Sequence, residues 1–382
     1  MNPRTDSLPE TRRRRLLVSL SSVAVLIVIG EAIWFSGPVQ DRQIALLTVE
    51  ELRRVAATEP GNTRVRFYLS EKLRELGLHE EARTQAEDAI RMDSTEPRTH
   101  RAAGLAALES GDLESAAQRL AQARSQGDLS EASVVGLARV ELAQQRMGAA
   151  LRTAESGVRR HPKSAELWFL LGRARGALGI PSGWRDAMAR ATELNPRVGR
   201  YWVGLAEARL FLDDGRGASD AARIAIALNT ADWRAWLAEA RAQSMVARTP
   251  DEIETALQAF GRAHTGAGLD SVEGLAEHGK YLLVLNRPVP AIPLLEQALA
   301  LVPDDPSYAY ALAGAYRRAG RTEQGRRLMA RFEAASGVRR EIRYLRARLT
   351  ANPADSTAAR RLEALVKSSE MPSETRDSTK KD

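Results

Sequence analysis

The sequence predicts an all-α protein in which about eight helical hairpins follow a single N-terminal transmembrane helix. Three observations lead to this prediction. The 382 residues are rich in alanine, leucine, arginine and glutamate and only 5% are aromatic, a composition that favours helix over sheet. A step of 34 residues recurs along most of the chain, and one strongly apolar run lies near its start. A repeat array can use most of such a chain as one body instead of two or three separate domains.

The apolar run from Leu16 to Phe35 is twenty residues long, which as a helix spans about 30 Å, the thickness of a bilayer's hydrocarbon core. Four arginines at 12–15 precede it, and Arg42 is the only basic residue in the fifteen that follow. The positive-inside rule then places the N-terminus in the cytoplasm. We therefore expect a cytoplasmic segment over 1–15, a membrane helix over 16–37, and the rest of the chain outside the membrane.

Two alternatives accompany this anchor. A cleaved signal peptide also begins with basic residues and an apolar core, but no A-x-A-like site follows, and Pro38 lies where cleavage would occur. Glu31 lies one turn from the outer end of the run. Its carboxylate either reaches the lipid headgroups or contacts another membrane helix.

Beyond residue 60, two series of residues share the 34-residue step. Trp168, Trp202 and Trp236 form one, and we expect these tryptophans in the core. The other falls in expected loops and consists of Pro60, Ser94, Asp128, Pro162, Pro196 and Thr230. Together they predict copies at 63–96, 97–130, 131–164, 165–198, 199–232, 233–271, 272–305 and 306–339. The sixth copy is five residues longer, and we expect the excess in its loops, near 248–250 or 265–268.

Several copies resemble the tetratricopeptide pattern W-x2-L-G-x2-Y…A-x3-F…P. Trp168-x2-Leu171-Gly172 is similar to its start, as is Trp202-x2-Leu205-Ala206, and Ala256-x3-Phe260 is similar to its second helix. The resemblance implies a right-handed α-solenoid over 63–339, in which small residues such as Gly172 let paired helices approach closely. Three departures bear on local packing: Glu239 stands in a leucine position, Trp184 stands in a small-residue position, and the first three copies lack tryptophan.

The flanks of the array are also expected to be largely helical. Thr48, Leu52 and Val55 indicate a half-repeat helix within a linker over 38–62. At the other end, 340–367 reads as capping helices, with one helix over 339–349 and another over 354–367. The last segment, 368–382, lacks apolar residues and is expected to be disordered.

The chain offers little that would support catalysis. It has no cysteine, no paired histidines at metal-binding spacing, no Walker-type loop and no G-x-S-x-G elbow. We therefore expect no enzyme activity, no cofactor and no metal, and we interpret the five histidines as solvated or loop residues. Of the net charge of +7, the first fifteen residues hold +3. The rest is expected to be spread too thinly to bind nucleic acid.

Binding to a protein or peptide is the remaining function class, with no small-molecule substrate. The resemblance to tetratricopeptide proteins implies a concave surface lined by the first helix of each hairpin. Its candidate residues here are Phe67, Glu71, Arg74, Phe169, Arg173, Arg200, Val203, Glu207, Arg234, Leu237 and Arg241. Arginine, glutamate and exposed aromatic side chains suit a peptide more than a small molecule. The lysine and asparagine clamp that binds chaperone tails in this family is not visible.

These expectations combine into a bacterial inner-membrane protein with its repeats in the periplasm. We expect it to act as an interaction scaffold, as an assembly factor or chaperone-like adaptor in envelope or membrane-complex biogenesis. The alternative is a stable structural subunit of one membrane complex, such as a polysaccharide exporter or an energy-converting assembly.

Overall fold

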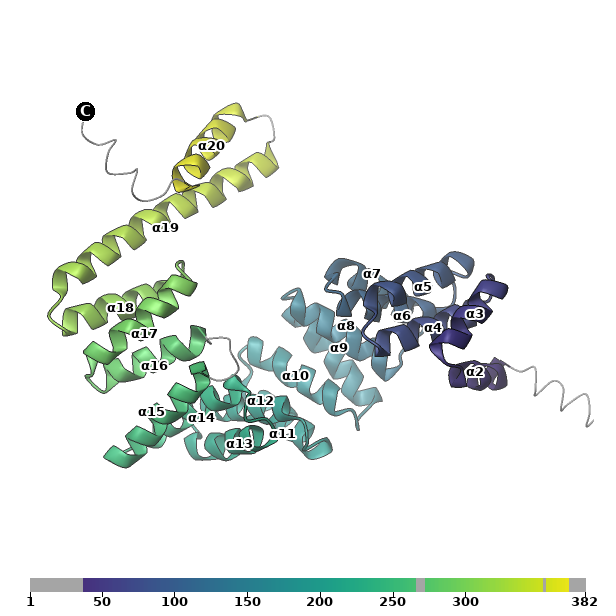
Figure 1. Cartoon of the computed structure of the whole chain (residues 1–382), viewed down its shortest axis with the longest axis horizontal. Helices are drawn as coiled ribbons and strands as arrows, with labels where there is room; N and C mark the ends of the chain where they lie inside the picture. The colour runs from purple at the N-terminus through teal and green to yellow at the C-terminus, as the bar shows by residue number, and fades with distance from the viewer. Residues whose placement is uncertain (1–36, 266–271, 353–354, 371–382) are drawn as a thin grey trace, which may run out of the picture. The chain divides into compact units, whose positions relative to one another are not determined.

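The computed structural model describes residues 37–265, 272–352 and 355–370, and every regular element within these ranges is an α-helix. The described chain divides into two compact units, the first ending at Leu194 and the second beginning at Asn195 (Figure 1). The expected membrane helix over 16–37 lies outside the described residues except for Gly37. The tail over 368–382, expected to be disordered, also lies outside them except for 368–370, which are helical and end the last helix, α20 (Ser356–Glu370). In the described ranges no helix is both long and apolar enough to cross a membrane.

The first unit consists of two leading helices and four hairpins. Its helices are α2 (Gly37–Leu46), α3 (Val49–Thr58), α4 (Thr63–Glu75), α5 (His79–Met92), α6 (Pro97–Glu109), α7 (Leu113–Ser125), α8 (Glu131–Ala143), α9 (Met147–Arg160), α10 (Ala165–Ala177) and α11 (Pro181–Leu194). Helices α4, α6, α8 and α10 begin at the first residues of the expected copies. The α3 helix is the half-repeat, and its N-cap Thr48 forms a capping box with Glu51.

The second unit continues the same alternation. Its helices are α12 (Gly199–Phe211), α13 (Gly215–Leu228), α14 (Trp233–Val246), α15 (Pro250–Thr265), α16 (Val272–Val284), α17 (Pro288–Leu301), α18 (Pro306–Arg318), α19 (Thr322–Ala351) and α20 (Ser356–Glu370). Four hairpins in each unit confirm the predicted solenoid of about eight. The α14 and α15 helices have 14 and 16 residues, against 13 and 14 in the preceding repeat. The extra residues of the sixth copy therefore lie partly in helix rather than only in loops.

The sequence sets the ends of the helices through short-range interactions. Side chains of Asn62, Asp112 and Ser164 accept hydrogen bonds from the first free backbone N–H groups of α4, α7 and α10. Within four of the hairpins the turn contains a glycine with positive φ, as at Gly77 and Gly111, a conformation that side chains with a Cβ disfavour. These local signals explain why the start of the first helix of each hairpin could be predicted closely.

Close approach of the paired helices also follows the predicted pattern. A Cβ at Gly279 in α16 would lie 2.6 Å from Cγ of Leu295 in α17. Leu295 is completely buried, together with Leu282 and Leu312. The glycine is therefore needed for the leucine of the second helix to fill the core of the hairpin.

The three tryptophans of the 34-residue series are half-buried and pack against core clusters. Each indole N–H donates a hydrogen bond to the loop carbonyl six residues before it: Trp168 to Pro162 at 3.0 Å, Trp202 to Pro196 at 2.8 Å and Trp236 to Thr230 at 2.9 Å. The prediction that they are core residues therefore holds for only part of each side chain, because an indole N–H needs a polar partner. These bonds also explain why the tryptophan series and the loop series keep the same register.

Copies without tryptophan satisfy the same loop carbonyl with other donors. Arg66 donates to Pro60 O at 3.2 Å and His100 donates to Ser94 O at 2.9 Å, both from the position that tryptophan takes later. Val134 in the third copy has no donor to offer. The lack of tryptophan in copies one and two therefore does not disturb the local packing.

The two unusual residues of copies four and six are accommodated by their neighbours. Gly176 leaves room for Trp184, since a Cβ there would lie 2.8 Å from the indole ring. Glu239 is 5% exposed and accepts hydrogen bonds from Ser219 Oγ at 2.7 Å, Gln243 Nε2 at 2.9 Å and Arg223 Nε at 3.0 Å. A buried carboxylate needs such donors.

The C-terminal flank differs from the prediction in one respect. Instead of a break between the eighth copy and a separate helix over 339–349, α19 runs continuously for 30 residues. Its sequence has no proline before Asn352-Pro353 that would remove a backbone hydrogen bond, and Ser336-Gly337 lies within the helix. Leu345 of α19 then packs with Ala358 and Leu365 of α20.

Candidate functional site

The predicted lining residues of the first unit lie on two helices. Phe67, Glu71 and Arg74 lie on α4, and Phe169 and Arg173 lie on α10. Arg173 is exposed, and Phe169 is half-buried beside the cluster around Ala138 and Leu142. The structure brings Phe67 and Glu71 together in one cleft, which does not include the two α10 residues.

This cleft, which we call the α4–α6 cleft, has a volume of about 440 Å³. It is lined by Ala45 of α2, by Phe67, Tyr68, Glu71, Lys72 and Glu75 of α4, and by Arg98 and Arg101 of α6. Arg98, Arg101 and Tyr68 are not among the lining residues predicted from the sequence. The signal for them was present, because Arg98 and Arg101 occupy in the second copy the positions of Arg64 and Phe67 in the first.

Phe67 forms the apolar part of the α4–α6 cleft. It is 6% exposed and packs on Ala86, Ile90 and Ala102. The guanidinium groups of Arg98 and Arg101 lie 5.5 and 5.7 Å from the centre of its ring, a distance that allows cation–π attraction. Phe67 is therefore less exposed than a surface aromatic, and the two arginines present the polar edge of the site.

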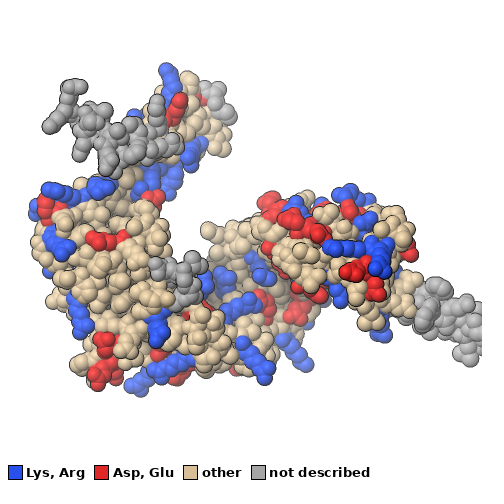
Figure 2. Space-filling model, viewed as in Figure 1, with Lys and Arg blue, Asp and Glu red and all other residues tan. Residues whose placement is uncertain are grey.

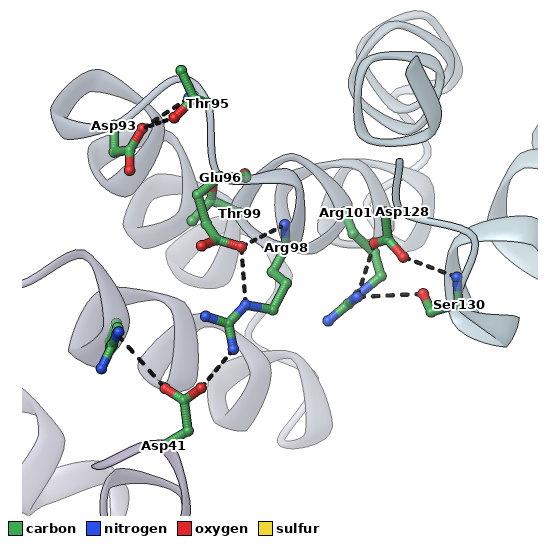
Figure 3. Close-up of polar contacts among 10 residues, drawn as sticks. Asp41, Asp93, Thr95, Glu96, Arg98, Thr99, Arg101, Asp128 and Ser130 are labelled. Atoms are coloured by element: carbon green, nitrogen blue, oxygen red, sulfur yellow. Dashed lines mark hydrogen bonds and ion pairs between the residues drawn. The ribbon is translucent and has the colours of Figure 1, made fainter. Parts of the chain in front are cut away.

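Arg98 is the centre of a charged network that includes α2 (Figure 3). It donates to Asp41 Oδ2 at 2.8 Å and to Glu96 Oε1 at 2.9 Å. The hydrogen bond to Glu96, and then that to Asp41, raises the pKa of Arg98 despite its partial burial. Arg64 Nε lies 3.8 Å from the other oxygen of Asp41, and Arg64 also donates to Gln40 at 2.6 Å. One carboxylate of α2 is thus held between arginines of two successive repeats.

Other charged residues of this surface are paired within the unit. Arg101 donates to Asp128 at 2.8 Å, and their side chains are only 14% and 6% exposed (Figure 3). Arg74, a predicted lining residue, donates to Glu109 at 2.9 Å and lies 3.8 Å from Glu71. These ion pairs fix the side chains, so the network is ordered before any partner arrives.

In the second unit the structure separates the predicted residues by burial. Val203 is 5% exposed and packs on Ala225 and Ala235, and Leu237 is 3% exposed and packs on Phe260. Both therefore belong to the core rather than to an open surface, because at this position the side chain points between its own second helix and the neighbouring hairpin.

The remaining four predicted residues of the second unit are polar and at least partly accessible. Arg200 lies 5.4 Å from the ring centre of Tyr201, and Arg234 lies 4.6 Å from that of Trp233. Glu207 is exposed. Arg241 pairs with Glu273 of α16 at 2.6 Å. Arg241 thus links successive repeats of the second unit.

The histidines differ from the prediction. His264 Nε2 lies 3.1 Å from His278 Nδ1, and His278 stacks on Phe260. Burial, and then the charge of His264, lowers the pKa of His278 to about 4. His100 is also buried. The paired histidines are fourteen positions apart and lie on two helices, α15 and α16, so the i, i+4 spacing of a helical pair does not predict their contact. Over the described ranges no group of three or more potential metal ligands occurs.

Positive charge is concentrated in α19. Acidic and basic side chains intermix over much of the visible surface (Figure 2), but α19 contains eight arginines and three glutamates. Some of these arginines pair with carboxylates, as Arg339 does with Asp304 at 2.7 Å and Arg348 with Asp355 at 2.6 Å. The local excess of positive charge is therefore higher in this helix than in the chain as a whole.

Comparison with known proteins agrees with the fold. Residues 131–174 and 285–349 match family models described as tetratricopeptide repeat. The chain is similar to a chain in the structure of the APC/C hetero-tetramer Cut9–Hcn1, with 15% identity, a TM-score of 0.56, and coverage of 70% of this chain and 52% of that one. It is also similar to a tetratricopeptide repeat protein from Parabacteroides merdae, with 14% identity, a TM-score of 0.52, and coverage of 66% and 98%.

These similarities are limited in sequence identity and in coverage. The chain spans about half the length of the Cut9–Hcn1 chain that it matches, and no curated protein sequence matches it. At such identities the solved structures show the fold alone. The family models and the fold together establish that the chain contains tetratricopeptide repeats.

Proposed function

We propose that this array of tetratricopeptide repeats is a membrane-anchored interaction scaffold that binds an acidic helical segment of a partner protein in the α4–α6 cleft. Tetratricopeptide proteins are generally protein-interaction scaffolds, and the present chain has the same repeat architecture. The proposal adds a location, a binding surface and the chemistry of the partner.

The observation that carries the proposal is the position of Asp41. The α2 helix is a ten-residue segment whose carboxylate lies between Arg64 and Arg98, which occupy equivalent positions in two successive repeats. Ala45 of the same helix reaches the wall of the α4–α6 cleft. Arginine pairs are well suited to bind carboxylates, and amphipathic helices commonly bind in grooves between helices. The segment α2 therefore serves as an example, within the chain itself, of the ligand that the surface fits.

The cellular role in the proposal rests on the sequence. The apolar run of 16–35 and the arginines before it support an inner-membrane anchor with the repeats in the periplasm. Since the sequence has no motif that would support catalysis, we assign no reaction to the chain. We propose a role as an assembly factor or chaperone-like adaptor in envelope or membrane-complex biogenesis.

Site-specific crosslinking in cells tests the surface. A photoreactive residue replaces Lys72, which lines the α4–α6 cleft, and the captured partner is identified by mass spectrometry. We expect Arg98→Glu to reduce capture at least tenfold, because it puts a negative charge where a carboxylate must bind. We expect Asp41→Asn to increase capture, because it releases the carboxylate that occupies the site. The control is Arg91→Glu, at an exposed arginine of α5 outside the cleft.

The outcomes separate the alternatives. Equal losses in Arg98→Glu and Arg91→Glu would contradict the proposed surface. A partner that copurifies in fixed stoichiometry through gel filtration would instead favour a stable structural subunit of a membrane complex. Protease accessibility of a C-terminal tag in intact and permeabilised cells tests the anchor, and a tag protected on the cytoplasmic side would refute the orientation.

A further inference from the structure

A second candidate site lies in the third repeat. The residues of its first helix occupy repeat positions other than those that line the α4–α6 cleft. This second site is a pocket of about 150 Å³, a volume similar to that of an engineered protein cavity that holds benzene. Its lining residues come from α7 to α9 and the loop between α7 and α8. Five of them are buried, namely Ser133, Val134, Leu137, Glu141 and Thr153, and form its floor.

Glu141 is the unusual residue of this floor. It is only 6% exposed, and its Oε2 atom has no hydrogen-bond partner among the described residues. The equivalent position in the next two repeats is an arginine, which donates across the hairpin to a backbone carbonyl: Arg175 to Gly183 O at 3.2 Å and Arg209 to Gly217 O at 2.6 Å. A carboxylate cannot donate such a bond. Glu141 therefore has a buried oxygen without a donor, whereas the arginines at the equivalent positions of the next two repeats have hydrogen-bond partners.

A buried, unsatisfied carboxylate is costly for a folded protein. Ligand sites are one place where such groups are retained, because the ligand supplies the missing donor. The apolar side chains of Val134 and Leu137 beside Glu141 exclude water from part of the pocket. A ligand that fits this floor combines an aliphatic stem with a cationic donor at its end.

The rim of the pocket has the opposite charge. Arg124 of α7 and Arg152 and Arg160 of α9 line it, and all three are exposed. Within the described part of the chain, none of these arginines forms an ion pair with an Asp or Glu side chain. Three unpaired guanidinium groups around one opening favour an anion, and a carboxylate in particular.

We propose that this pocket binds lysine carrying a free carboxylate, with the side-chain ammonium on Glu141 and the carboxylate at the arginine rim. The four-carbon stem of lysine then lies against Val134 and Leu137. The cation of this ligand reaches the buried carboxylate of the floor, and its anion stays at the exposed arginines of the rim. Free lysine and the C-terminal lysine of a peptide share this chemistry.

Equilibrium dialysis of the purified full-length chain in mild detergent tests the proposal with two labelled probes. One is L-lysine, and the other is the peptide Ala-Ala-Ala-Lys with a free C-terminus. Binding of the free amino acid alone, of the peptide alone or of both supports the site and identifies the source. L-Norleucine, which lacks the side-chain ammonium, and the C-terminally amidated peptide, which lacks the free carboxylate, are expected to compete at least tenfold more weakly. Binding of neither labelled probe at millimolar concentration would overturn the proposal.

Variants test the assignment of each end. Glu141→Gln keeps the shape of the side chain and is expected to weaken binding at least tenfold, while Glu155→Gln, on α9 outside the pocket, is the matched control. The double variant Arg152→Gln, Arg160→Gln changes only exposed residues, so folding is retained, and it is expected to weaken binding at least fivefold. Unchanged binding in Glu141→Gln, or equal competition by norleucine, would show that Glu141 does not hold the ligand.

Discussion

The hydrogen bond between Trp202 and the loop before α12 gives the most direct test of how the repeat is built. The indole N–H donates to Pro196 O at 2.8 Å, and Trp168 and Trp236 make the same bond in their own repeats. Trp202→Phe removes the donor and keeps an aromatic ring. The loop carbonyl then has to find a water molecule as its donor.

The size of the effect follows from the exposure of the bond. A net intramolecular hydrogen bond contributes about 0.5–1.5 kcal/mol, and Trp202 is only half-buried, so that water can replace part of it. We expect Trp202→Phe to lower the free energy of unfolding by about 1 kcal/mol. Because the three sites are a full repeat apart, their effects are expected to add, giving about 3 kcal/mol for the triple variant.

Urea unfolding followed by far-UV circular dichroism measures the change, and hydrogen exchange of the 195–202 backbone reports where it acts. The exchange measurement matters because repeat arrays open locally as well as globally. Trp233→Phe is the matched control. Trp233 is the first residue of α14 and packs under Arg234, and its indole makes no hydrogen bond with the described residues.

A second substitution separates the hydrogen bond from ring size. Trp202→His retains a donor at the position where His100 makes the equivalent bond in the second repeat, so faster exchange of the loop is not expected, although apolar contact is lost. Equal destabilisation by Trp202→Phe and Trp233→Phe, with no change in loop exchange, would refute the role assigned to the indole N–H.

Three further predictions follow from the second unit. Gly279→Ala is expected to destabilise by about 1–3 kcal/mol, because the new methyl group meets completely buried Leu295 at 2.6 Å; urea unfolding measures it. Glu239→Ala is expected to cost about 2–3 kcal/mol in the same assay, because its donors lose a buried acceptor. Stability is expected to fall as the pH falls from about 6.5 to about 4, by no more than about 3 kcal/mol, because burial and His264 lower the pKa of His278 to about 4.

The sign of the pH effect is fixed by the two states of His278. In the unfolded chain the imidazole takes up a proton near its ordinary pKa of 6.5, while in the folded chain it stays neutral until about pH 4. Protons therefore favour the unfolded chain within this window, and partial exposure of the ring reduces the effect. A His278→Gln variant is expected to lose this part of the pH dependence. An unchanged slope between pH 7 and 4.5 would contradict the assignment.

For Gly279→Ala the matched comparison is Gly172→Ala, where the nearest atom is the flexible Cε of Met188. That methyl can move, so a smaller loss is expected, and equal losses would refute the argument from rigid packing. For Glu239 the comparison is Glu239→Leu, which restores an apolar residue that fills the space. If Glu239→Ala were as stable as the parent chain, its buried hydrogen bonds would contribute nothing.

Part of the candidate site could be predicted and part could not. The register of the repeats placed Phe67 and Glu71 in the lining of the α4–α6 cleft, although Phe67 is only 6% exposed. The same register failed for Val203 and Leu237, because position along one helix does not say how closely the next hairpin covers it. Asp41 could not be placed beside Arg98 at all, since 57 residues separate them and no pattern in the sequence relates them.

The sequence by itself determined the class of the fold and the start of the first helix of each hairpin. Caps, turn glycines and the 34-residue step are short-range signals that act within one hairpin, so they can be read from neighbouring residues. Only the tertiary structure explains why the tryptophan and loop series share a register. Each indole N–H donates to the loop carbonyl six residues before it, and the two groups meet only when the chain has folded. The tertiary structure also decided which arginines form ion pairs. Arg74 and Arg101 pair with carboxylates within the first unit. Arg124, Arg152 and Arg160 instead line the pocket that has Glu141 in its floor. Burial and pairing depend on contacts between helices that are distant in the sequence, and these contacts exist only once the hairpins have stacked.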